Sequence, residues 1–112
     1  MLGELVEVLS GKTLDVYLEE NFYKPMNLSH THFRPKEKEE IENIVPTIEA
    51  IDFRNSQIRG NVHDEASALL GGVAGHAGLF STSEDLFVIC QMLLNKGEYN
   101  GIRYIDSTTV DL

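Results

Sequence analysis

Apolar side chains recur at helical spacing in three parts of the chain, and this pattern predicts three helices. The first spans residues 2–10, the second runs from Thr13 to about Phe22, and the third covers residues 82–95. Residues three or four positions apart share one face of a helix, so each stretch would present an apolar face to a core. In the third helix the predicted buried face consists of Leu86, Ile89, Cys90, Leu93 and Leu94, widened by Phe87 and Val88.

Polar residues, glycine and proline mark the ends of these helices. Ser10-Gly11 closes the first helix, Thr13 can cap the second, and Pro25 ends it. Ser81 is predicted to cap the third helix, because Glu84 stands three residues further on and the pair has the spacing of a capping box. The start of the third helix is therefore expected to be firmly fixed.

A hairpin and a short helix are predicted towards the end of the chain. Lys96-Gly97 suits the end of the third helix. Asn100-Gly101 favours a tight turn between two strands, because both residues tolerate positive φ. Asp106 or Ser107 would then cap a final short helix.

The periodic pattern weakens between residues 27 and 72. Prolines, a run of charges and a polar stretch interrupt it, and the only strands predicted here are short ones at Val45–Glu49 and Ile51–Phe53. Irregular segments of this length are usually functional or disordered. The sequence as a whole therefore predicts a mainly α-helical chain with a long irregular loop and minor short β-strands.

Composition narrows the class of protein. The chain has 112 residues, of which 42% are hydrophobic, as is usual for a folded single domain. The formal net charge of −9 disfavours nucleic acid and anionic membrane surfaces as partners. No apolar run approaches the ~20 residues that cross a bilayer, so no membrane span is predicted. The single cysteine, Cys90, cannot form an internal disulfide and is expected to be a buried small hydrophobe.

A glycine-rich loop precedes the third helix. Residues 71–78 contain four glycines, which permit turns and close approaches that side chains would prevent. Loops of this kind commonly line a site.

Four segments in this order, residues 2–14, 23–31, 62–66 and 71–86, resemble the middle of a serine β-lactamase-like hydrolase. The most similar members are class C β-lactamases and the related esterases and penicillin-binding proteins. The resemblance implies the helical portion of an α+β fold and, for the parent enzyme, acyl transfer from an amide or ester to a serine followed by hydrolysis. It also implies a small-molecule or peptide substrate, no cofactor, and a parent that acts outside the cytoplasm.

The catalytic motifs of that family are missing from the chain. No serine has lysine three residues later and no tyrosine has asparagine two residues later, so no catalytic residue is assigned. We therefore expect residues 1–112 to be a single partial domain, an internal fragment that is inactive without the remainder of the catalytic domain. The alternative is a noncatalytic binding or regulatory module built on the same scaffold.

The resemblance also assigns substrate-binding residues. Aligned through Ser81-Thr82, the glycine loop matches the Ala-Tyr-Gly-Val-Lys-Ser-Thr segment of class C β-lactamases, and the residues expected to bind substrate are Gly75, His76, Ala77 and Gly78. Ala77 stands where those enzymes carry a tyrosine that forms one wall of the acyl pocket. The open wall favours an esterase or peptidase over a cephalosporin hydrolase.

The other histidines have two interpretations each. His30 and His32 could join His63 and Asp64 in a zinc site, or could simply form hydrogen bonds at the surface. The sequence His63-Asp64-Glu65 could supply acid–base chemistry, or could hold the long loop through hydrogen bonds to backbone groups. The second interpretation is preferred in both cases, and no metal is predicted.

Overall fold

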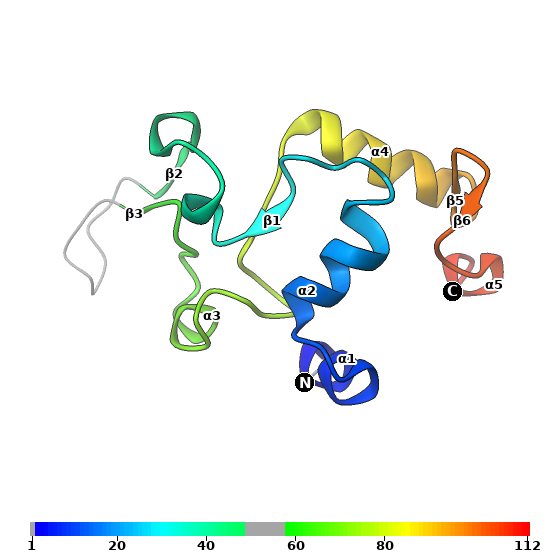
Figure 1. Ribbon diagram of the computed structural model, residues 1–112, viewed down its shortest axis with the longest axis horizontal. Helices are drawn as coiled ribbons and strands as arrows, with labels where there is room; N and C mark the ends of the chain where they lie inside the picture. Colours follow the sequence, from blue (N-terminus) through cyan, green and yellow to red (C-terminus); the bar gives the residue numbers. More distant parts are fainter. Residues whose placement is uncertain (1, 49–57) are drawn as a thin grey trace. The chain divides into compact units, whose positions relative to one another are not determined.

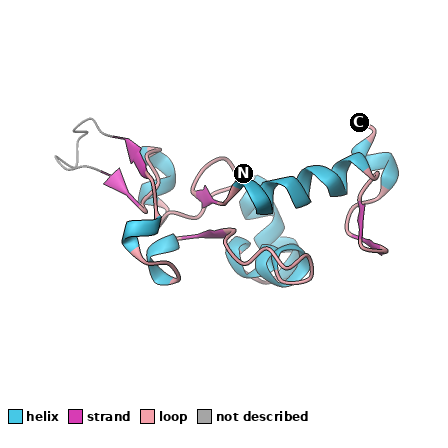
Figure 2. Cartoon of the chain, turned by 90° about the horizontal axis from the view of Figure 1, so that it is seen from above, coloured by secondary structure: helices cyan, strands magenta, loops and turns pink. Residues whose placement is uncertain are grey.

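The computed structural model describes residues 2–48 and 58–112 (Figure 1). Helices dominate these residues, and every strand is two or three residues long (Figure 2). The prediction of a mainly helical chain with minor β-structure is confirmed. The helical elements are α1 (Leu2–Ser10), α2 (Leu14–Leu18), the π-helical turn η1 (Glu19–Tyr23), the 3-10 turns η2 (Pro35–Glu37) and η3 (Ile41–Asn43), α3 (Glu65–Leu69), α4 (Ser83–Leu94) and α5 (Ser107–Val110).

The described strands form two-stranded antiparallel sheets: β1 (His32–Phe33) with β4 (Leu79–Phe80), β2 (Pro46–Ile48) with β3 (Ile58–Arg59), and β5 (Glu98–Tyr99) with β6 (Ile102–Arg103). Strand β2 confirms the strand expected at Val45–Glu49. The strand expected at Ile51–Phe53 lies outside the described residues. Helix α3 and strands β1 and β4 were not predicted, because elements this short carry no readable period.

The chain forms two compact units. Unit 1 contains the chain up to Tyr17 together with His32–Phe80, and unit 2 contains Leu18–Thr31 together with Ser81–Leu112. In unit 1 the sheet β1–β4 pairs His32 with Phe80 in register. This pairing fixes the point at which the glycine loop ends. Among residues 2–48 and 58–112, no helix is long and apolar enough to cross a membrane.

The helix ends that depend on local sequence are placed as predicted. Helix α1 ends at Ser10, and the amide of Gly11 donates to the Glu7 carbonyl at 2.8 Å. The hairpin β5–β6 turns through Asn100 and Gly101, which have φ of 50° and 77°. Helix α5 is capped by Asp106, whose side chain accepts from the Thr108 amide at 2.9 Å.

Unit 2 has its core between the segment that follows α2 and one face of α4. Four buried residues form it, with exposures of 3–8%: Tyr23, Met26, Leu28 and Met92. Phe22 and Tyr104 pack against this cluster with ring centroids 6.2 Å apart. The helix predicted up to Phe22 is present, but it changes from α-helical to π-helical geometry at Glu19.

The predicted buried face of α4 is right at Ile89 and Val88, which pack against the core, and wrong at its other positions. Leu86, Leu93 and Leu94 are 48%, 42% and 76% exposed, and Cys90 is exposed as well. The buried residues of α4 are Asp85 and Met92, and Val88 and Ile89 pack between them in the same stripe. Apolar residues occur on more than one face of α4, so the pattern alone does not single out the buried face. The carboxylate of Asp85 makes the true buried stripe look polar in the sequence.

The predicted capping box is also wrong. Thr82 caps α4, with its hydroxyl accepting from the Asp85 amide at 3.3 Å. The Ser81 hydroxyl lies 2.7 Å from the Thr31 hydroxyl instead, and Glu84 accepts from Ser83 at 3.2 Å. Ser81 therefore joins two segments of unit 2 rather than starting the helix.

Asp85 is the centre of this polar contact. Its carboxylate is 7% exposed and accepts from the His30 amide at 2.9 Å and the Thr31 hydroxyl at 2.8 Å. Buried carboxylates are tolerated where such donors surround them. Asp85 thus joins the segment before β1 to the first turn of α4.

Candidate functional site

The glycine loop, residues 71–78, connects α3 to β4 through a tightly closed backbone. Gly78 is buried with φ +105°, a conformation that side chains rarely adopt. A Cβ at this position would overlap the Gly72 carbonyl oxygen. Only glycine fits here, so the two ends of the loop lie in direct backbone contact.

Helix α1 also packs closely against this loop. A Cβ on Gly75 would lie 3.0 Å from the Gly3 amide nitrogen, and a Cβ on Gly3 would lie 3.2 Å from the Gly75 nitrogen. Contacts this short between backbones favour glycine on both sides, because a side chain at either position would force its neighbour to shift by a few tenths of an ångström. The predicted close approach of the glycine loop to another segment is confirmed, and the partner is α1.

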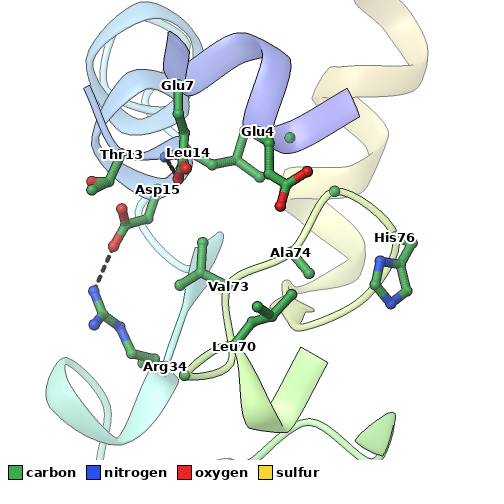
Figure 3. Close-up of a pocket in the computed structure, with 13 residues that line it drawn as sticks. Glu4, Glu7, Thr13, Leu14, Asp15, Arg34, Leu70, Val73, Ala74 and His76 are labelled. Atoms are coloured by element: carbon green, nitrogen blue, oxygen red, sulfur yellow. Dashed lines mark hydrogen bonds and ion pairs between the residues drawn. The ribbon is translucent and has the colours of Figure 1, made fainter. Parts of the chain in front are cut away.

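A pocket of about 390 Å³ lies where α1, the start of α2 and the glycine loop meet (Figure 3). This volume falls within the range of ~300–1,000 Å³ found for small-molecule sites. All of the lining residues belong to unit 1: Gly3, Glu4, Glu7, Thr13, Leu14, Asp15, Arg34, Leu70, Gly71, Val73, Ala74, Gly75 and His76.

An ion pair forms one side of the pocket. The Arg34 guanidinium donates to the Asp15 carboxylate at 2.5 Å, and Figure 3 places the pair opposite His76. Partial burial raises the pKa of Asp15, but hydrogen bonds from Thr13 and the Val16 amide and the charge of Arg34 outweigh it. The pKa of Asp15 therefore lies below its ordinary value, and the carboxylate is charged at neutral pH.

Helix α3 holds the glycine loop from the other side. Asp64 caps α3 by accepting from the Ser67 amide at 2.7 Å, and its carboxylate lies 3.1 Å from His76 Nε2. The Ser67 hydroxyl donates to the Ala77 carbonyl at 3.1 Å. The pKa of Asp64 is lowered, first by the Ser67 amide and then by the contact with His76. Asp64 therefore caps a helix and contacts His76, and whether residues 63–65 hold the long irregular loop stays a prediction.

The four predicted substrate-binding residues are distributed around the loop. Gly75 and His76 line the pocket just described. Gly78 lines a second pocket of about 440 Å³, also within unit 1. Ala77 is half-buried and lines neither of these two pockets. The assignment of these residues to substrate remains a prediction.

The histidines considered as zinc ligands have different surroundings. His32 is buried in β1, where its Nε2 lies 3.8 Å from the Glu39 carboxylate. His30 and His63 are exposed. Within the described part of the chain, no three His, Cys, Asp or Glu side chains are grouped so that they could hold a metal ion.

Arg34 and Asp15 were missed as site residues. Arg34 has φ +49° and directly precedes Pro35. A positive φ is unusual for a residue with a side chain, and also for a residue that precedes proline. Its partner is 19 residues away in sequence, so no local pattern could have revealed the pair. The carboxylate of Asp15 at the start of a helix was the only available signal.

The family model described as Beta-lactamase matches residues 1–109 of the chain. An N-acetylmuramyl-L-alanine amidase of Bacillus subtilis (strain 168) is 41% identical over 100% of the chain and 28% of its own length. A protein of Escherichia coli (strain K12) named as a D-alanyl-D-alanine carboxypeptidase is 39% identical over 100% of the chain and 29% of its own length. The chain therefore spans under a third of the curated relatives that it matches.

A solved structure has the same fold. The octameric penicillin-binding protein homologue from Pyrococcus abyssi matches with a TM-score of 0.63 and 16% identity, over 98% of this chain and 22% of that one. At this identity the likeness concerns the fold alone. It agrees with the expected helical portion of a β-lactamase or transpeptidase-like fold.

Proposed function

Since the chain belongs to the beta-lactamase family of serine hydrolases, we propose that it forms the part of such a hydrolase that shapes one side of the substrate cleft. The reaction is acyl transfer from an amide or ester to a serine, followed by hydrolysis. The chain has no Ser-x-x-Lys and no Tyr-x-Asn sequence. The nucleophile and its base come from the remainder of the catalytic domain, and the 112 residues alone are inactive.

The substrate contacts come from Gly75, His76, Ala77 and Gly78. The closed backbone of the glycine loop and its fixed attachment to α1 support this assignment, because a binding surface must hold its shape. Ala77 leaves the acyl wall open, which favours an esterase or peptidase.

The substrate class is an amide whose nitrogen is supplied by alanine, so that hydrolysis of the amide releases the alanine amine. The observation that carries this is 41% identity over the whole chain with a relative named for the bond between an N-acetylmuramyl group and L-alanine. A second relative, at 39%, is named for the bond between two D-alanines. Both names describe an alanine amine as the leaving group.

The exposed apolar side of α1 supports the proposal that these 112 residues pack against the remainder of the catalytic domain. Leu2, Leu5 and Leu9 are 52–78% exposed, although they belong to the apolar face that the sequence predicts for this helix. Apolar helix faces are normally buried against a partner. The remainder of the hydrolase covers this face.

The experiment compares the 112-residue chain with the longer reading frame around it, using nitrocefin, p-nitrophenyl acetate and N-acetylmuramyl-L-alanine. We expect no turnover by the chain alone and hydrolysis of the amide by the longer protein. Turnover by the chain that disappears in Ser81→Ala would contradict the inactivity. Binding of N-acetylmuramyl-L-alanine by the longer protein without hydrolysis of any substrate would favour the binding module.

A further inference from the structure

Ser67 closes the glycine loop with its carbonyl and its hydroxyl, while its amide belongs to the cap of α3. Its amide donates to Asp64 at 2.7 Å, its carbonyl accepts from the Gly72 amide at 2.8 Å, and its hydroxyl donates to the Ala77 carbonyl at 3.1 Å. One residue of α3 therefore binds the loop near its first and last positions.

The hydroxyl is buried against the end of the loop. Ser67 is 0% exposed. A Cβ on the neighbouring Gly78 would lie 3.2 Å from the Ser67 oxygen. Because the loop cannot shift towards Ser67 or accept water there without rearranging, this hydrogen bond determines where the Ala77 peptide lies.

Asp64 adds a second attachment from the same helix. Its carboxylate caps α3 and lies 3.1 Å from His76 Nε2, one residue before Ala77. Both side chains of this contact are accessible, with relative exposures of 58% for His76 and 42% for Asp64. Ser67 is thus the buried attachment and Asp64 the exposed one.

We propose that Ser67 is a positioning residue that sets acyl-group selectivity by holding Ala77 through its backbone carbonyl. This inference rests on the proposed function, in which Ala77 forms the open wall of the acyl pocket. Ser67 does not contact the substrate. It acts only through the position of the loop.

The test uses Ser67→Ala in the longer protein, with Ser83→Ala as the matched control. The Ser83 hydroxyl is exposed and donates to the adjacent Glu84 at 3.2 Å, so this control removes a hydroxyl that lies outside the loop. The first readout is hydrogen–deuterium exchange of residues 71–78, which we expect to speed up about tenfold in Ser67→Ala because one hydrogen bond is lost. The second is the ratio of kcat/KM for p-nitrophenyl phenylacetate and p-nitrophenyl acetate.

In Ser67→Ala we expect this ratio to change about three- to tenfold through KM, while kcat for p-nitrophenyl acetate stays as in the unsubstituted protein. In Ser83→Ala both the exchange and the ratio should stay as in the unsubstituted protein. If Ser67→Ala does not fold, Ser67→Cys keeps a weaker donor of similar size and should shift both readouts less, in the same direction. Unchanged exchange would overturn the positioning role, and faster exchange with an unchanged ratio would overturn the role in selectivity. A parent protein that hydrolyses no ester or amide would instead refute the proposed function, while the exchange readout would still decide whether Ser67 fixes the loop.

Discussion

Removing the carboxylate of Asp85 should be among the most destabilising single changes in unit 2. Asp85→Ala deletes the acceptor of the Thr31 hydroxyl at 2.8 Å and of the His30 amide at 2.9 Å. It also leaves a small cavity beside the first turn of α4. The change therefore detaches the segment before β1 from the helix.

The magnitude follows from burial and from the donors involved. Thr31 is 2% exposed, so its hydrogen bond to a carboxylate should contribute about 1.5–3 kcal/mol. The His30 amide belongs to an exposed residue and should contribute about 1 kcal/mol. Together Asp85→Ala should cost about 2.5–4 kcal/mol of unfolding free energy, and Asp85→Asn, which keeps one acceptor oxygen, about 1–2 kcal/mol.

Urea unfolding followed by circular dichroism at 222 nm measures these costs. The matched control is Glu84→Ala, which changes an exposed carboxylate in the same turn and should cost less than about 1 kcal/mol. If Asp85→Ala cost no more than Glu84→Ala, the carboxylate would not organise unit 2, and the reasoning from burial would be refuted.

Three further predictions concern unit 2. Met92→Ala should cost about 2–5 kcal/mol of unfolding free energy, because Met92 is 3% exposed. Leu94 lies in the same helix but is 76% exposed, so Leu94→Ala should cost less than about 1 kcal/mol. Equal urea midpoints for the two variants would contradict the observed buried face. Gly97→Ala should destabilise more than Gly101→Ala, because both have positive φ but only at Gly97 would a Cβ overlap a carbonyl oxygen; the reverse order of Tm would be inconsistent with this contact. Burial raises the pKa of Tyr23 from 10.0 to about 12, so its contribution to stability is complete below pH ~10 and is lost as pH rises towards ~12. Absorbance at 295 nm should show this late step in the parent chain and lose it in Tyr23→Phe, and a step that persists would rule out the assignment.

Features set by neighbouring residues could be predicted from the sequence. The turn at Asn100 and Gly101, the cap at Asp106 and the end of α1 at Ser10 each depend on a few adjacent positions. The glycine loop was predicted to make close approaches because glycine alone permits them. Its partner could not be named, because nothing in residues 71–78 points to α1.

Features set by distant contacts could not be predicted. The stripe of α4 that contains Asp85 and Met92 is buried, but a carboxylate in it looks like a solvent-facing position until its donor at Thr31, 54 residues away, is known. The same applies to the candidate site, where Arg34 pairs with Asp15 on one side of the pocket. The family motifs located the loop, while the charges around it emerged only from the fold.

The contact between Gly3 and Gly75 restricts how this pocket can be diversified. A side chain at either position would force α1 or the loop to shift by a few tenths of an ångström, so substitutions there change the shape of the pocket through its backbone. Leu70, Val73 and Ala74 line the same pocket with side chains that do not lie at this backbone crossing, so they can be varied without moving α1. The two glycines thus separate positions that change the pocket through its backbone from positions that change only its lining.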